Sequence, residues 1–210
     1  MRRAARAPHM DSGHLIVGLG NPGAQYSRTR HNAGFLLVER LAERWGMGWS
    51  DEKKFQARVA AGRRGAERVW LCQPQTFMNL SGEAVAAMVQ FYQVPLARVL
   101  VAVDDADLPL GGLRLRPHGS SGGHHGLESI ELHLGSQAVA RLRIGIGRLD
   151  GMREISNHVL GKFDASESVL LEKVLTRAAE QAECWLDAGI EKAMNQYNGV
   201  VSSGNENTKK

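Results

Sequence analysis

Hydrophobic and polar positions along the chain follow two different periods, and segments of the two kinds alternate. Apolar residues at the spacing of an amphipathic helix fill residues 33–45 and 81–92. Short apolar or alternating runs, typical of strands, fill residues 14–19, 54–61, 67–73, 99–103, 112–116 and 140–147. Further helices are expected over residues 126–134 and over the alanine-rich stretch 166–195. This order predicts one α/β domain in which a mixed central sheet is flanked by helices.

The two ends of the chain lack this patterning. Residues 1–13 hold three arginines and no apolar run, so they are expected to form a disordered basic arm and not a secretory signal. An upstream start ahead of Met10 is one explanation for this arm. Residues 198–210 are polar and are expected to form a disordered tail. The predicted domain therefore runs from residue 14 to 197.

Composition narrows the class of protein. With 210 residues, of which 43% are hydrophobic and 23% charged, the chain suits one soluble domain with a sizeable core. Its apolar runs stay shorter than the ~20 residues of a membrane span. Cys72 and Cys184 are too few and too distant to suggest a disulfide framework, which favours the reducing cytoplasm. A net charge of +4 permits an anionic partner without establishing one.

The first strand leads into residues 18–23, GLGNPG, which match the pattern G-x-G-x-x-G. A dinucleotide site needs a helix directly after these glycines, and an acidic residue at the end of the next strand. Here a polar segment, residues 24–32, follows instead, and Pro22 supplies no N–H for a phosphate. Glu39 and Glu43 fall inside the predicted helix. We therefore interpret the glycines as a strand-to-loop turn that places Asn21 at the end of a strand.

Polar clusters follow several predicted strands at their carboxyl ends, where open α/β sheets bind ligands. Asn21 follows the first strand, and Asp104, Asp105 and Asp107 follow the apolar run 99–103. Further polar clusters occupy residues 26–32 and 73–79, and a glycine-rich loop at 117–126 is expected to cover this edge. The sequence therefore predicts a candidate site at the carboxyl edge of the sheet.

These polar clusters together resemble the bacterial peptidyl-tRNA hydrolase family. The matching segments are GLGNPG at 18–23, YSRTRHNAG at 26–34, FMNLSG at 77–82, DDADLP at 104–109 and RLRIGIG at 141–147. They occur in the order of the family between about residues 14 and 195. The resemblance implies an enzyme that cleaves the ester joining a peptide to the 3′ ribose of tRNA, without a metal or organic cofactor. It also implies a cytoplasmic monomer whose partner is peptidyl-tRNA and not a membrane.

The resemblance implies three catalytic residues. His31 is the general base that activates water, Asp104 orients its imidazole, and Asn79 donates to the developing oxyanion or positions the water. These residue types suit the reaction, because an imidazole exchanges a proton near neutral pH and a carboxylate fixes its tautomer. An amide N–H suits a carbonyl oxygen that gains charge. Asp105 and Asp107 remain rivals of Asp104, and Asn79 has the alternative of a helix cap.

Further residues are implied in substrate binding. Asn21 and Met78 line the peptide and ester site, and Tyr26 lies near the 3′-terminal adenosine. Arg116 and Arg143 match basic positions that hold tRNA phosphate, a contact that makes affinity depend on salt. Alternatives remain open: Met78 suits the core equally well, and single arginines are commonly solvated surface charges.

Three histidines of the glycine-rich loop, His118, His124 and His125, raise the question of a metal site. No acidic or cysteine ligand stands beside them at metal spacing, and adjacent histidines do not easily converge on one ion. A metal site is therefore not expected.

The same loop departs from the family, which usually shows His-Asn-Gly followed by a basic residue. Here the segment reads His124-His125-Gly126-Leu127-Glu128, so His124 matches the family histidine and His125 stands in the place of the asparagine. Both are expected to contact substrate, His125 through an imidazole whose charge varies with pH. The alternative function is a non-catalytic RNA-binding relative of the same fold. The presence of His31, Asp104 and Asn79 favours the enzyme.

Overall fold

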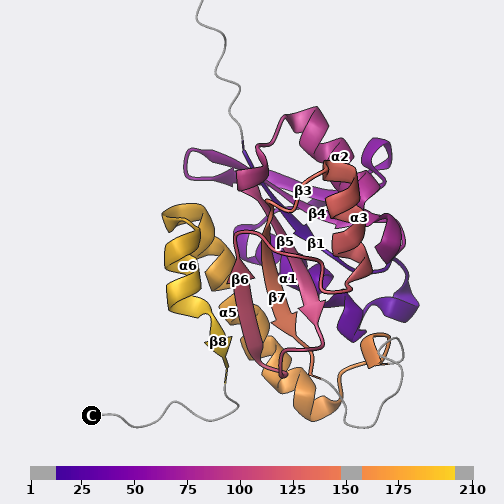
Figure 1. The fold of residues 1–210 in the computed structure, drawn as a ribbon, viewed down its shortest axis with the longest axis vertical. Helices are drawn as coiled ribbons and strands as arrows, with labels where there is room; N and C mark the ends of the chain where they lie inside the picture. Colours follow the sequence, from indigo (N-terminus) through magenta and orange to yellow (C-terminus); the bar gives the residue numbers. More distant parts are fainter. Residues whose placement is uncertain (1–12, 148–157, 202–210) are drawn as a thin grey trace, which may run out of the picture.

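The computed structural model describes residues 13–147 and 158–201, and its centre is a mixed sheet of eight strands in the order β2-β3-β4-β1-β5-β7-β6-β8 (Figure 1). Neighbouring strands β4, β1, β5 and β7 run parallel, whereas β2, β3, β6 and β8 pair antiparallel with their neighbours. The strands are β1 (His14–Gly18), β2 (Trp49–Glu52), β3 (Ala57–Arg64), β4 (Glu67–Pro74), β5 (Val99–Asp105), β6 (Gly112–Arg116), β7 (Ala140–Gly145) and β8 (Gly199–Val200). The predicted mixed α/β sheet is confirmed.

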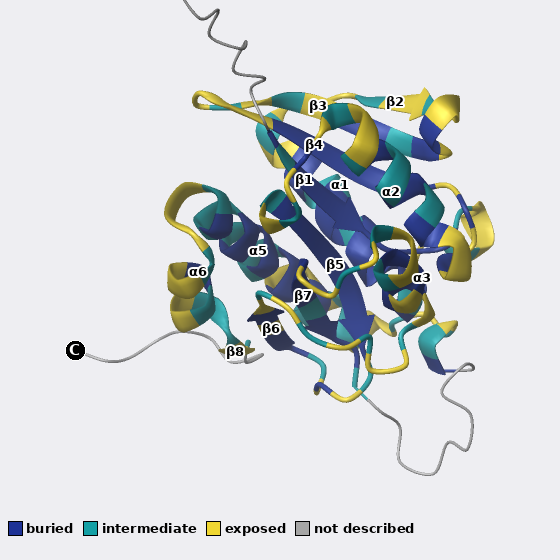
Figure 2. Ribbon diagram, turned by 45° about the horizontal axis from the view of Figure 1, so that its top comes forward, coloured by how far each residue is buried: buried dark blue, intermediate teal, exposed yellow. Residues whose placement is uncertain are grey.

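Helices cover both faces of this sheet, because alternate residues of each central strand point to opposite sides. On β1, Ile16 packs in one apolar cluster with α1 (Ala33–Trp45), α5 (Ala165–Ala188) and α6 (Ile190–Tyr197). Its neighbours Leu15 and Val17 belong to a second cluster, with α2 (Ser81–Tyr92) and α3 (His125–Leu134). Figure 2 shows the central strands buried between these layers. No helix among the described residues is long and apolar enough to cross a membrane.

Several predicted boundaries move for identifiable reasons. The strand expected from residue 54 begins at Ala57, because a 3₁₀ turn occupies Lys53–Phe55. The expected helix 166–195 is two helices, since Gly189 adopts a φ of 82° between α5 and α6. Two strands were not predicted. The β2 sequence WSDE is too polar to signal a strand, and β8 has only two residues.

Residues 198–201, which the sequence assigns to a polar tail, are attached to the sheet in the structure. The Asn198 side chain accepts a hydrogen bond from the Leu115 N–H at 2.7 Å and donates to the Leu115 carbonyl at 3.2 Å. β8 then pairs with β6, and the Val201 N–H donates to the Gly111 carbonyl at 2.9 Å. The sequence pattern does not reveal this attachment, because a single amide side chain makes it and not an apolar run. Most of the expected arm (residues 1–12) and the rest of the tail (residues 202–210) lie outside the described residues.

The glycines of the G-x-G-x-x-G segment serve close packing between β1 and α1. A Cβ on Gly18 would lie 2.2 Å from the carbonyl oxygen of Gly34, and one on Gly20 would lie 2.7 Å from the Phe35 ring. α1 does not start directly after the glycines, because two 3₁₀ turns, Ala24–Tyr26 and Arg30–Asn32, come first. This geometry supports a packing role and not a phosphate cradle.

Candidate active site

The carboxyl ends of β1 and β5 lie side by side, and a cleft of about 470 Å³ opens there. The polar clusters from the ends of these two strands do meet in it, as the sequence predicts. The glycine-rich loop and the start of α3 form another wall. The lining residues are Asn21, His31, Asp104, Asp105, Ala106, Asp107, Gly122, Gly123, His124, His125, Arg143, Val159 and Leu160.

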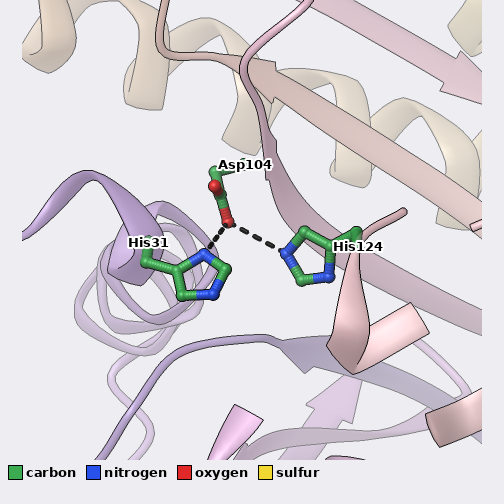
Figure 3. A group of neighbouring side chains, drawn as sticks. All are labelled: His31, Asp104 and His124. Atoms are coloured by element: carbon green, nitrogen blue, oxygen red, sulfur yellow. Dashed lines mark hydrogen bonds and ion pairs between the residues drawn. The ribbon is translucent and has the colours of Figure 1, made fainter. Parts of the chain in front are cut away.

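Asp104 stands at the centre of this cleft between two imidazoles (Figure 3). Its Oδ1 oxygen lies 2.9 Å from Nδ1 of His31 and 3.0 Å from Nε2 of His124. The Asp104 side chain is only 3% exposed, because it lies near the carboxyl end of β5, a strand that is buried along its whole length. Three residues that are far apart in the sequence thus form one triad on a single carboxylate oxygen.

The hydrogen bonds of the triad decide which imidazole nitrogens carry a proton. An ionised carboxylate can only accept, so both nitrogens that face Asp104 donate to it. The other nitrogen of His124, Nδ1, accepts from the backbone N–H groups of Gly126 and Leu127 at 3.2 and 3.4 Å, and thereby caps α3. His31 has no such second partner among the described residues. With Nδ1 protonated, its Nε2 keeps a lone pair, which is the requirement for a general base.

The charge of Asp104 is stabilised against its burial. Burial alone would raise the pKa of this carboxyl group. The imidazoles of His124 and His31, through hydrogen bonds and electrostatic attraction, outweigh that effect and hold the pKa of Asp104 well below its usual range. Asp104 is therefore ionised in the folded protein near neutral pH.

The same triad offers three ligand atoms that lie within 4.8 Å of one another, a spacing that could hold a metal ion. No acidic residue stands beside His124 within the loop, but the fold brings Asp104 to within 3.0 Å of its ring. However, a metal-bound histidine normally donates through its second nitrogen. Here the second nitrogen of His124 accepts two backbone N–H groups, so a metal on Nε2 would require an imidazolate. The geometry favours a hydrogen-bonded triad over a metal centre.

A second network fixes the turn that carries His31. The Asn32 side chain accepts from the Asn21 N–H at 2.9 Å and donates to the Asn21 carbonyl at 3.0 Å. The Asn21 side chain in turn accepts from the Met78 N–H at 2.9 Å. Asn21 therefore both lines the cleft and joins β1 to the segment before α2. The predicted site residues do not include Asn32, although it stands beside His31 in the same motif.

The other residues of the FMNLSG and YSRTRHNAG segments are not brought to the cleft. Met78 is buried, and a Cβ on Gly126 would lie 2.6 Å from its sulfur, so Met78 packs beneath the start of α3. Asn79 is exposed, and α2 shows no side-chain cap among the described residues, which argues against the helix-cap alternative. Tyr26 is half-buried in its 3₁₀ turn. Neither Asn79 nor Tyr26 lines the cleft that the described residues form.

The two predicted phosphate-binding arginines occupy different surroundings. Arg143 lines the cleft, with a guanidinium nitrogen 3.3 Å from the Asp105 carboxylate and donors to the Ser120 and Ser121 carbonyls at 2.9 and 3.0 Å. It therefore holds the glycine-rich loop to the sheet. Arg116 lies outside the cleft, exposed on β6, where no ion pair or hydrogen bond to another described residue is found.

These arginines belong to one face of the β6–β7 ribbon. Residues directly opposite in an antiparallel pair share a face, and Arg114 pairs with Arg143 while Arg116 pairs with Arg141. Arg141 is buried against Glu131 of α3, at 3.0 Å. The opposite face of the ribbon carries apolar residues of the core: Leu113, Leu115, Leu142 and Ile144. Two inner arginines are thus paired within the fold, whereas the two on β6 face solvent.

His125 lies at the rim of the cleft. Its side chain is 73% exposed, and its Nδ1 is 3.0 Å from a carboxylate oxygen of Glu128. The hydrogen bond from His125 lowers the pKa of Glu128. The residue in the place of the family asparagine is therefore turned toward its own helix, with Nε2 left without a partner among the described residues.

Comparison with known proteins gives a consistent result. The family model for peptidyl-tRNA hydrolase matches residues 15–208. A peptidyl-tRNA hydrolase of Synechococcus sp. (strain JA-3-3Ab) is 50% identical over 190 residues, which cover 90% of this chain and 84% of that protein. One of Thermoanaerobacter sp. (strain X514) is 45% identical over 186 residues, which cover 89% of this chain and 100% of that protein.

Solved structures agree with the sequence comparison. The crystal structure of peptidyl-tRNA hydrolase from Acinetobacter baumannii matches with a TM-score of 0.85 and 39% identity, covering 92% of this chain and 98% of that one. A 5′-methylthioadenosine nucleosidase from Arabidopsis thaliana matches with a TM-score of 0.53 at 10% identity, covering 84% of this chain and 96% of that one. The second likeness concerns the fold alone.

Proposed function

Because the chain belongs to the peptidyl-tRNA hydrolase family, we propose that it hydrolyses the ester between a peptide and the 3′ ribose of tRNA, with His31 as the general base. The products are free tRNA and free peptide. The observation that carries this assignment is the contact between His31 Nδ1 and Asp104 Oδ1, at 2.9 Å, in the wall of the cleft.

The proposed reaction begins with a water molecule held between His31 Nε2 and the ester carbonyl. The water loses a proton to Nε2 as its oxygen bonds to the carbonyl carbon, and the imidazolium is stabilised by the Asp104 carboxylate. The tetrahedral intermediate then collapses, the bond to the ribose 3′ oxygen breaks, and His31 returns the proton to that oxygen. No cofactor takes part in this scheme.

Other residues assist in this proposal. His124 acts through Asp104, as the second donor to its carboxylate. Asn79 is assigned to the oxyanion or the water on the strength of the family motif, and its exposed position requires it to turn inward when substrate binds. Asn21 lines the ester site, and the buried Met78 supports it through the hydrogen bond from the Met78 N–H to the Asn21 side chain. These roles place Asn21 and the triad at the ester and leave the exposed Asn79 to complete the site.

The tRNA contacts are proposed to lie outside the ester site. Exposed Arg116 contacts a backbone phosphate, and Tyr26 lies near the 3′-terminal adenosine. Arg143 orders the loop that covers the substrate, and His125 contacts substrate at the rim of the cleft. The alternative of an RNA-binding protein without hydrolysis finds no support, because RNA binding does not require a buried carboxylate held against His31.

We further propose that the protein works as a monomer in the cytoplasm, where peptidyl-tRNA is produced by ribosomes. Both cysteines are free thiols, as a reducing compartment requires. Sedimentation of the purified protein tests the monomer, and fractionation of cells tests the compartment.

One assay tests the proposed reaction. Purified protein is mixed with N-blocked aminoacyl-tRNA, and release of the N-blocked amino acid is followed with and without EDTA. Release by the wild type that EDTA does not abolish, and that His31→Ala nearly eliminates, supports the proposal. Tight tRNA binding without release would instead support the RNA-binding alternative.

A further inference from the structure

Three consecutive side chains, those of Arg30, His31 and Asn32, tie one 3₁₀ turn to three separate elements. His31 reaches Asp104 at the end of β5, and Asn32 reaches Asn21 after β1. Arg30 points elsewhere and pairs with Glu167 in the first turn of α5. The first attachment holds the proposed base and the second holds Asn21 at the cleft, whereas Arg30 is not among the residues that line the cleft.

We propose that Arg30 is a positioning residue, which sets His31 against Asp104 and couples His31 to the apolar wall of the cleft. This inference rests on the proposed function of His31 for its kinetic consequences. Its structural core, the placement of the His31 imidazole by Arg30, can be tested separately.

The Arg30 side chain is deeply enclosed. The residue is 7% exposed, and its Nη2 lies 2.9 and 2.7 Å from the two carboxylate oxygens of Glu167. Its guanidinium carbon lies 4.8 Å from the centre of the Phe163 ring. These contacts fix the side chain in one orientation, since a planar guanidinium can both pair with a carboxylate and stack on an aromatic ring.

The pair is poorly arranged as a source of stability. One guanidinium nitrogen takes both carboxylate oxygens, and the other, Nη1, is buried without a partner among the described residues. A stabilising arginine–carboxylate pair usually engages two nitrogens in parallel. Burial also removes hydration from both charges, which offsets much of their attraction. The pair is therefore better explained as a device that positions Arg30 than as a source of folding stability.

Glu167 is a rigid anchor for this purpose. Its carboxylate accepts from the Asp164 N–H at 2.8 Å, and Asp164 accepts from the Glu167 N–H at 2.8 Å, which forms a capping box at the start of α5. α5 spans 24 residues and packs into the core along its length. The Arg30 side chain is therefore anchored to α5, a long helix that is packed into the core.

The backbone of the same residue holds the cleft wall. The Arg30 N–H donates to the Gly161 carbonyl at 2.9 Å, and Thr29 forms a bridge with Lys162. Val159 and Leu160, just before this attachment, line the cleft and present apolar surface to it. Arg30 thus joins the proposed base to a wall suited to an apolar part of the acyl group.

The experiment compares Arg30→Met, Arg30→Lys and the double variant Arg30→Met/Glu167→Gln with the wild type. Glutamine at position 167 preserves the capping box, and the double change leaves no buried charge unpaired. Arg44→Met is the matched control, because Arg44 also pairs with a glutamate of α5, Glu183 at 3.0 Å, but joins α1 to α5 away from the cleft. Single-turnover rates, KM, Tm and the ¹H NMR signal of the His31 Nδ1–H are measured for each.

We expect Arg30→Met to lower the single-turnover rate by ~10- to 100-fold with KM within a few-fold, as expected of a misplaced catalytic group. Arg30→Lys should fall between it and the wild type. The double variant should regain Tm without regaining rate, and both methionine variants at position 30 should lose or shift the Nδ1–H signal. Arg44→Met should keep rate and signal. We also expect the rate loss to be greater for a bulky apolar acyl group than for a glycyl group.

Two results would overturn the inference. One is a wild-type rate and Nδ1–H signal in folded Arg30→Met, and the other is a rate that follows Tm in every variant, the control included. A failure of the proposed function looks different, because His31→Ala would then stay active while the Nδ1–H signal still responded to Arg30.

Discussion

Two polar regions near the cleft are built in opposite ways: the buried triad around Asp104, and the exposed arginines of β6. In the triad, every nitrogen that faces Asp104 has a fixed donor role, and the carboxylate is shielded from water. On β6, Arg114 and Arg116 extend into solvent and form no ion pair or hydrogen bond through their side chains with a described residue. Chemistry demands groups whose positions are settled before substrate arrives. Binding a polyanion demands charges that the fold leaves unpaired.

The largest effect is expected from His31→Ala, which removes the proposed base from the preorganised region. The rate should fall by ~10²–10⁴-fold, the usual contribution of a general base. Binding of tRNA should survive, because the β6 arginines are untouched. The exposed His118→Ala serves as the control and should behave as the wild type. His31→Ala activity within a few-fold of the wild type would remove the triad from the chemistry.

The next effect separates two adjacent carboxylates. Asp104→Asn places an amide where two imidazole N–H groups now donate, so it should disturb the His31 tautomer and lower the rate by more than ~10-fold. Asp105→Asn loses the ion pair to Arg143 but keeps an acceptor for the Asp107 N–H. Asp105→Asn should therefore lower the rate much less than Asp104→Asn. Steady-state rates and circular dichroism of both variants check this, and equal losses would contradict the assignment of Asp104.

A smaller effect should distinguish the exposed Arg116 from Arg143, which is paired with Asp105. Arg116→Ala should raise KM a few-fold with little change in kcat, and flatten the slope of log affinity against log salt by roughly one unit. Arg143→Ala should lower kcat as well, because Arg143 holds the loop carbonyls of Ser120 and Ser121. Arg68, exposed on β4, supplies the control Arg68→Ala. If Arg116→Ala and Arg143→Ala changed KM, kcat and the salt dependence alike, the proposed difference in role between the two arginines would be wrong.

Much of the fold follows from local patterning. The helices over 33–45 and 81–92 have the predicted bounds, because their apolar faces repeat at helical spacing. The preference for Asp104 over Asp105 also rests on a local signal, its place directly after an apolar run. The β2 strand carries no comparable signal, since its residues are polar and its partner β3 alone defines it.

What the sequence could not supply is contact between distant residues. Nothing near His124 indicates that Asp104, 20 positions earlier, lies 3.0 Å from its ring. Arg116 and Arg143 look alike in sequence. Only the β6–β7 register and the position of Asp105 show that Arg143 forms an ion pair, whereas Arg116 forms none with a described residue. The role of Arg30 depends on Glu167, 137 positions away. Such pairings arise from topology, which local periodicity does not encode.

The smallest effect concerns His125, which stands between the two regions, exposed like the β6 arginines but on the rim of the cleft. An asparagine here offers both a donor and an acceptor, whereas a neutral imidazole already bonded to Glu128 through Nδ1 offers only Nε2. Protonation of the imidazole would remove that acceptor and add charge at the rim.

His125→Asn should therefore keep or raise the rate and simplify the acid limb of the pH profile, and His125→Ala should lose activity moderately, far less than His31→Ala. Glu128→Gln is the matched control, because it weakens the hold on Nδ1 while retaining the imidazole, and it should change the acid limb without abolishing activity. Complete pH–rate profiles of the wild type and the three variants measure this. If all four curves superimpose, His125 points into solvent and has no part in the reaction, neither in catalysis nor in substrate binding.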